Sequence, residues 1–137
     1  MYLVKAAAFV IVLLTGSVAG CATFAEPSAS VVDFETPLSR LQPLQGYLRQ
    51  PAGSGPSPAV VLLHGCAGGA EELDRRWGQR VAGWGYLTLT VDSFGPRGLK
   101  NTCGSSAPVD LAFDAYRALG YLVQQSYVDP ARVAVLG

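Results

Sequence analysis

Two hydrophobic patterns alternate along the chain from residue 59 onward. Five consecutive apolar residues at 59–63 are typical of a strand that is buried on both faces. Leu73, Trp77 and Val81 then recur every fourth residue among charged side chains, and Gly85 follows them. This spacing predicts an amphipathic helix over 71–85 with these three residues on its buried face.

The same patterns predict the remaining elements. Strands are expected at 30–36, 44–51, 86–92 and 132–136, the last of them buried and leading into a tight turn at Gly137. A second helix is expected over 109–125, with an apolar stripe made of Val109, Phe113, Tyr116, Leu119 and Val123. The alternation of strands and helices predicts one α/β domain over 30–137 with a mostly parallel, helix-covered sheet.

Two expectations about single side chains follow from the helical stripes. The aromatic residues on or beside them should lie in the core: Trp77, Trp84, Tyr116 and Tyr121. Asp110 and Asp114 lie at the start of the second helix, where we expect one to interact with the helix dipole and the other to face solvent.

The chain begins with a segment of a different kind. One Lys, a compact apolar run and a group of small residues predict a secretory signal peptide over 1–20. Residues 18–21 read Val-Ala-Gly-Cys and resemble the signal of bacterial lipoproteins. This resemblance implies lipidation of Cys21, a tether over 21–29, and an exported protein anchored to the bacterial membrane, facing the periplasm or the exterior. An uncleaved signal anchor and ordinary cleavage near Cys21 are the alternatives.

Composition excludes two classes of function. Ten basic residues balance ten acidic ones without a basic run, which argues against a nucleic-acid-binding protein. The chain has one His and three Cys without a close C-x-x-C spacing, which argues against a zinc site built from this chain. We therefore expect no metal.

Candidate chemistry lies where ligands bind in open parallel sheets, beyond the carboxyl ends of the strands. The loops 64–69 and 92–98 and the terminal Gly137 occupy this edge of the predicted sheet. Ser93 comes closest to a G-x-S-x-G motif but lacks the first Gly, and His64 is the only imidazole. We expect His64 to brace its loop by hydrogen bonding, with a catalytic pair between His64 and Ser93 as the alternative.

Four segments together resemble the amino-terminal part of an α/β-hydrolase, and within that fold the dienelactone hydrolase family. They are VVLLHGCAGG, GYLTLTVDSFGPRG, AFDAYRALGYL and VDPARVAVLG. The resemblance implies hydrolysis of a small ester or lactone without a cofactor. It assigns the oxyanion-hole loop to Gly65, Cys66 and Ala67, with Cys66 as the expected N–H donor, and makes Gly137 the first Gly of the nucleophile elbow. The nucleophile would follow two residues after Gly137 and the acid and His later, so the chain as given is expected to lack the triad and to be inactive.

Three features of this resemblance leave alternatives open. The glycines of the 64–69 loop either let the backbone approach an oxyanion or only end a strand tightly. Arg97 either binds a substrate carboxylate, as dienelactone hydrolases bind acidic lactones, or forms an internal ion pair, with Asp92 as a candidate partner. Cys66 and Cys103 either form a disulfide between two loops that are neighbours in this fold or remain two small buried residues.

A second function class remains open from the sequence. The chain is then a non-catalytic, lipid-anchored binding module on a hydrolase-like scaffold. Because strand 132–136 would expose an apolar edge, a partner would have to cover it.

Overall fold

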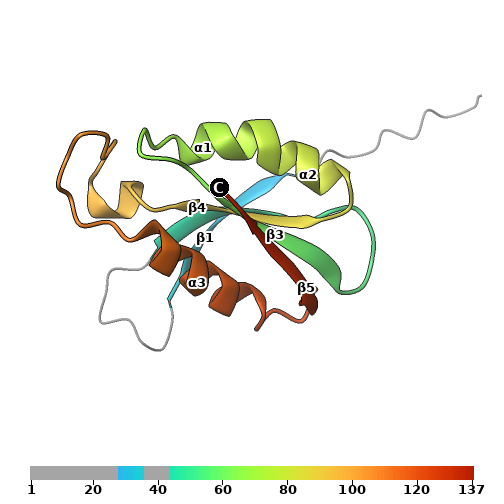
Figure 1. Ribbon diagram of the computed structural model, residues 1–137. Helices are drawn as coiled ribbons and strands as arrows, with labels where there is room; N and C mark the ends of the chain where they lie inside the picture. Colours follow the sequence, from blue (N-terminus) through green and yellow to red (C-terminus); the bar gives the residue numbers. More distant parts are fainter. Residues whose placement is uncertain (1–27, 36–43) are drawn as a thin grey trace, which may run out of the picture.

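A five-stranded mixed sheet forms the centre of the computed structural model, which describes residues 28–35 and 44–137 (Figure 1). Its strands lie in the order β1-β2-β4-β3-β5. Their bounds are β1 Ala29–Phe34, β2 Leu44–Arg49, β3 Ser57–Leu63, β4 Leu87–Asp92 and β5 Val128–Leu136. β2 is antiparallel to both β1 and β4, whereas β4 and β5 both run parallel to β3. The predicted signal peptide and Cys21 lie outside the described residues.

Helices cover both faces of this sheet (Figure 1). α1 (Ala70–Leu73), a π-helical turn η1 (Asp74–Gly78) and α2 (Gln79–Gly83) form one continuous helical segment on one face. α3 (Leu111–Leu122) lies on the other face, and a short 3₁₀ turn, η2 (Gly95–Arg97), follows β4. The predicted order of strands and helices is confirmed, and with it the α/β class. In the described part of the chain, no helix is long and apolar enough to cross a membrane.

The two parallel strands at the centre form the core. β4 is buried from Leu87 to Val91, and β3 buries Ala59, Val61 and Leu62. Gly46 of β2 lies so close to β4 that a Cβ there would be 2.9 Å from the carbonyl oxygen of Thr90. The strand pairing therefore requires a residue without a side chain at this position.

Both helical segments bury faces that agree only in part with the predicted ones, since Val81 and Leu119 face the core as expected but the aromatic residues of the stripes do not. The first buries Ala70, Asp74, Gly78, Val81 and Ala82, while α3 buries Asp114, Ala115, Arg117, Ala118 and Leu122. Trp84 is 63% exposed and Tyr116 is 72% exposed, so the prediction that they lie in the core is wrong. The reason is that ion pairs draw charged side chains of both segments against the sheet, which turns the apolar stripes outward.

Within the described residues, β5 has a neighbouring strand on one side only, although its apolar residues predict a buried strand. It pairs with β3, and Val135 and Leu136 are 44% and 58% exposed. Periodicity alone does not distinguish a strand with neighbours on both sides from one at the edge of a sheet. Position in the sheet therefore decides the exposure of β5.

Candidate functional site at the carboxyl ends of the parallel strands

The carboxyl ends of β3, β4 and β5 meet at one edge of the sheet. Leu62 is in register with Leu136, and Leu63 with Val91. The chain therefore leaves all three strands side by side. Gly137 lies against β3, because a Cβ on it would be 3.1 Å from the Cβ of Leu63. The segment after β5 thus begins beside the loop that follows β3.

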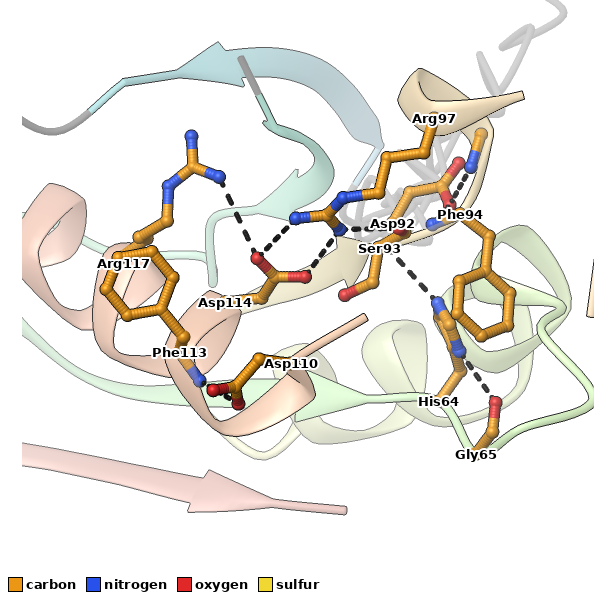
Figure 2. Close-up of polar contacts among 11 residues, drawn as sticks. His64, Gly65, Asp92, Ser93, Phe94, Arg97, Asp110, Phe113, Asp114 and Arg117 are labelled. Carbon is orange, nitrogen blue, oxygen red and sulfur yellow. Dashed lines mark hydrogen bonds and ion pairs between the residues drawn. The ribbon is translucent and has the colours of Figure 1, made fainter. Parts of the chain in front are cut away.

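His64 links the loops that follow β3 and β4 (Figure 2). Its Nε2 accepts a hydrogen bond from the backbone N–H of Ser93, 3.2 Å away. Nδ1 therefore carries the ring proton and donates it to the carbonyl oxygen of Gly65 at 2.9 Å. The ring also packs edge-on against Phe94, with 4.4 Å between the ring centroids. The expectation that His64 braces the loop is confirmed, and both ring nitrogens are engaged in that role.

Ser93 does not form the alternative catalytic pair with His64. The contact uses the backbone N–H of Ser93, whereas its buried Oγ makes no hydrogen bond among the described residues. His64 is thus not placed to take the hydroxyl proton of Ser93.

Asp92 fixes the turn after β4. Its carboxylate accepts hydrogen bonds from the backbone N–H groups of Phe94 and Gly95.

Arg97 forms the internal ion pair, but its partner is Asp114 rather than Asp92 (Figure 2). Its Nη1 lies 2.6 Å from Oδ2 and its Nη2 2.9 Å from Oδ1 of Asp114, a bidentate pair. Nη1 also donates to the carbonyl oxygen of Ser93 at 2.6 Å. Asp114 raises the pKa of Arg97. The guanidinium proposed to receive a substrate carboxylate is thus bound to a carboxylate of the protein itself.

The expectation of a solvated side chain at the start of α3 is wrong for Asp114. Asp114 is fully buried, and Arg117 lies one turn away with its Nη1 3.7 Å from Oδ1. Burial lowers the pKa of Arg117, because the desolvated guanidinium is less favourable in its charged form. Asp110 fits the expectation, since its carboxylate caps the helix by accepting from the N–H of Phe113. Sequence reasoning missed this buried cluster because its partners are distant along the chain.

A disulfide joins Cys66 in the loop after β3 to Cys103 in the loop after β4, with their Cα atoms 4.9 Å apart. The backbone N–H of Thr102 donates to the carbonyl oxygen of Cys66 at 2.8 Å. Gly68 adopts a φ of +75°, and a Cβ on it would collide with the backbone of Lys100. A disulfide, a hydrogen bond and a close backbone contact therefore hold the two loops together.

The residues assigned to the oxyanion-hole loop are exposed at this edge. Gly65, Cys66 and Ala67 all face solvent, and the carbonyl oxygen of Gly65 accepts from the N–H of Gly68. The backbone N–H groups of Cys66 and Ala67 donate no hydrogen bond among the described residues. The loop thus has backbone donors that the fold itself does not use. Within residues 28–35 and 44–137, no three His, Cys, Asp or Glu side chains gather as metal ligands do.

Comparison with solved structures identifies the fold. A putative dienelactone hydrolase from Klebsiella pneumoniae superposes with a TM-score of 0.59 at 18% identity, over 79% of this chain and 49% of that one. A bacterial heroin esterase gives 0.63 at 23% identity, over 82% and 35%. A 2,6-dihydroxy-pseudo-oxynicotine hydrolase gives 0.61 at 25% identity, over 81% and 30%.

The described part of the chain has an α/β-hydrolase-like fold that matches part of each of these structures. The chain spans between 30% and 49% of the length of the three structures. No protein-family model matches the sequence, and no curated protein matches it either.

Proposed function

We propose that this chain forms the oxyanion-hole side of the active site in a hydrolase of small esters or lactones, of the dienelactone hydrolase type. The observation that carries the proposal is the register between β3 and β5, which sets Gly137 against Leu63, the last residue of β3 before His64 and the Gly65–Ala67 loop. In a hydrolase of this fold, a nucleophile on the turn after β5 would then face backbone donors on the loop after β3. The names of the similar structures support the same reaction class.

We propose the following reaction for the complete enzyme. The nucleophile attacks the carbonyl carbon of the ester, and the carbonyl oxygen becomes an oxyanion. The N–H of Cys66 donates a hydrogen bond to that oxyanion, worth roughly 3 kcal/mol in the transition state. The tetrahedral intermediate collapses, which breaks the bond to the alcohol oxygen and releases the alcohol after it is protonated. Water then attacks the acyl intermediate and releases the acid and the free nucleophile. His64 and the Cys66–Cys103 disulfide contribute by holding the donor loop before the substrate arrives.

The first experiment reads the coding DNA beyond the codon for Gly137. We expect x-S-x-G or x-C-x-G in frame, and hydrolysis of 4-nitrophenyl acetate by the product of the complete reading frame. Replacing that Ser or Cys with Ala should abolish the activity. A stop codon directly after Gly137, or an inactive product, contradicts the proposal.

A matched pair of variants tests the donor in the complete product. Cys66→Ala with Cys103→Ala removes the disulfide and keeps the N–H of residue 66, whereas Cys66→Pro with Cys103→Ala removes the N–H as well. We expect kcat to be about 100-fold to 1000-fold lower in the second variant than in the first. Equal values of kcat would assign the oxyanion contact to another group.

We also propose that the protein is exported and anchored to a membrane through a lipid on Cys21. The motif over residues 18–21 is the support for this proposal. Labelled fatty acid should be incorporated into the protein in bacteria and should be lost from the Cys21→Ser variant. Equal labelling of both proteins would exclude lipidation at this residue.

The non-catalytic binding module remains the second candidate, favoured by one observation. The apolar residues Phe113, Tyr116, Val135 and Leu136 are exposed on α3 and β5. Such a surface is typical of a site that another polypeptide segment covers. If the DNA shows a stop codon after Gly137 and the chain is monodisperse and melts cooperatively, this candidate replaces the hydrolase.

A further inference from the structure

A cluster of arginine and tryptophan side chains lies on the outer side of the first helical segment, away from the candidate site. Five residues of η1 and α2, together with Trp84 directly after α2, line one shallow depression there: Arg75, Arg76, Gln79, Arg80, Gly83 and Trp84. Trp77 lies beside it, with the guanidinium of Arg80 5.2 Å from its ring centroid. We call these seven residues the basic–aromatic face.

The helix geometry keeps this face clear of the sheet. Arg76, Arg80 and Trp84 follow one another at intervals of one turn, whereas Asp74 and Gly78 point at the sheet and are buried. α2 ends at Gly83, directly before β4 begins at Leu87, so the face lies toward the amino end of β4. The candidate site occupies the opposite edge of the sheet and makes no use of these side chains.

The charge of this face is positive and its aromatic rings are accessible. The lining of the depression includes three arginines and no carboxylate. Glu72 pairs with Arg75, which leaves Arg76 and Arg80 without a carboxylate partner among the described residues. Trp77 is 37% exposed and Trp84 63%. Both rings therefore keep accessible surface, and Trp84 keeps the larger share.

The start of β1 lies at the same edge of the sheet as the amino end of β4, because Arg49 of β2 is in register with Thr88 of β4. Ala29, the first residue of β1, is in register with Arg49 of β2. The guanidinium of Arg49 binds the carboxylate of Asp74 in η1, with Nη2 2.8 Å from Oδ2. The chain makes seven residue-to-residue steps from Cys21 to Ser28, and a fully extended chain spans at most about 3.6 Å per step. A lipid on Cys21 therefore holds this edge within roughly 25 Å of a bilayer.

We propose that the basic–aromatic face rests on an anionic phospholipid surface. The proposal relies on the lipid anchor proposed above and goes beyond it by naming the side of the domain that meets the membrane. Tryptophan side chains favour the headgroup level of a bilayer, and arginines are attracted to anionic headgroups. This orientation turns the carboxyl edge of the sheet, with the candidate site, away from the membrane and toward solvent.

The two tryptophans of the chain, Trp77 and Trp84, both belong to this face, so tryptophan fluorescence reports on it directly. The full lipidated chain is purified from bacterial membranes and reconstituted into vesicles that contain brominated phospholipids. In vesicles of phosphatidylcholine with phosphatidylglycerol, we expect quenching and a blue shift of the emission. Replacing the anionic lipid, raising the salt concentration to 1 M, or introducing Arg76→Gln with Arg80→Gln should lower the quenching to roughly half or less, since each removes the charge attraction.

The control moves the fluorophore to the other face of the sheet. Trp77→Phe, Trp84→Phe and Tyr116→Trp together leave one tryptophan at the exposed position on α3. We expect little quenching of this variant in the same vesicles. Equal quenching of the two proteins, or quenching that ignores lipid charge and salt, overturns the proposal.

Co-sedimentation with the vesicles distinguishes the two proposals. If the chain co-sediments but Trp77 and Trp84 are not quenched, the anchor stands and the orientation is wrong. If the chain does not co-sediment, both are wrong.

Discussion

Asp114→Asn tests whether the buried ion cluster holds α3 to the loop after β4. The substitution keeps the shape of the side chain and removes its charge. Asp114 has no solvent exposure, and both of its oxygens contact guanidinium groups, of Arg97 at 2.6 and 2.9 Å and of Arg117 at 3.7 Å. The variant therefore replaces a carboxylate that two guanidinium groups share with a neutral amide.

The expected loss follows from how far each arginine is buried. Removing one partner of a buried ion pair costs about 3–5 kcal/mol, because the remaining charge stays desolvated. The side chain of Arg97 is 24% exposed and regains some contact with water, whereas that of Arg117 is 1% exposed and does not. The amide oxygen of the new Asn still accepts one hydrogen bond. We therefore expect the free energy of unfolding to fall by about 3 kcal/mol, and by more for Asp114→Ala.

Equilibrium unfolding in urea, followed by far-ultraviolet circular dichroism, measures this loss; tryptophan emission is less suitable because Trp77 and Trp84 are exposed. The matched control is Asp110→Asn at the start of the same helix. Because Asn caps a helix about as well as Asp, we expect this substitution to change the free energy of unfolding by less than about 0.5 kcal/mol. If the two variants had the same free energy of unfolding, the ion cluster would be refuted as a source of stability. A double-mutant cycle with Arg97→Met should give a coupling energy of roughly 1–3 kcal/mol, and additive losses would mean that Arg97 and Asp114 do not act as a pair.

Three further predictions concern other parts of the described structure. The Cys66–Cys103 disulfide spans 37 residues, so Cys66→Ala with Cys103→Ala should lower the unfolding free energy by about 4 kcal/mol from the gain in unfolded-chain entropy, and an unchanged urea midpoint would contradict this. Gly46→Ala should cost about 1–3 kcal/mol because its Cβ meets the backbone of β4, and a stability equal to the parent would show that the strands separate freely there. Burial and the neighbouring Tyr121 raise the pKa of Tyr127 from 10.0 to about 12, so the folded state binds this proton more tightly than the unfolded chain. Stability should therefore fall as the pH rises through that range, and Tyr127→Phe, compared in urea titrations at pH 9 and 12, should lessen the fall.

Most of the secondary structure could be predicted from the sequence, because runs and periods of apolar residues are local properties. The run at 59–63 became β3, and the alternation of strands and helices predicted the sheet and its class. The position of His64 at the end of β3 was sufficient to predict a bracing role, because a side chain there has a neighbouring loop within reach. Asp110 was predicted at the helix start by the same local reasoning.

The tertiary structure decided which faces are buried. Arg97 and Asp114 are 17 residues apart, and Arg49 and Asp74 are 25 apart, so no local pattern pairs them. In each pair, the guanidinium group compensates the charge of a buried carboxylate. Leaving that carboxylate buried without a partner would cost more free energy than exposing apolar residues of the stripe, so the ion pairs set the orientation of the helices. For this reason Trp84 and Tyr116 face outward against expectation.

The same distinction between local pattern and tertiary contact applies to the candidate site. The amino-acid pattern alone was enough to locate the ends of the parallel strands, and with them the candidate loops 64–69 and 92–98 and the position of Gly137. Only the tertiary structure decided the partners within that edge, by setting Gly137 against Leu63, bringing Cys66 to Cys103 and assigning Arg97 to Asp114. The physical reason is that strand position follows from local hydrophobicity, whereas the pairing of polar groups depends on distances that exist only after the sheet has formed.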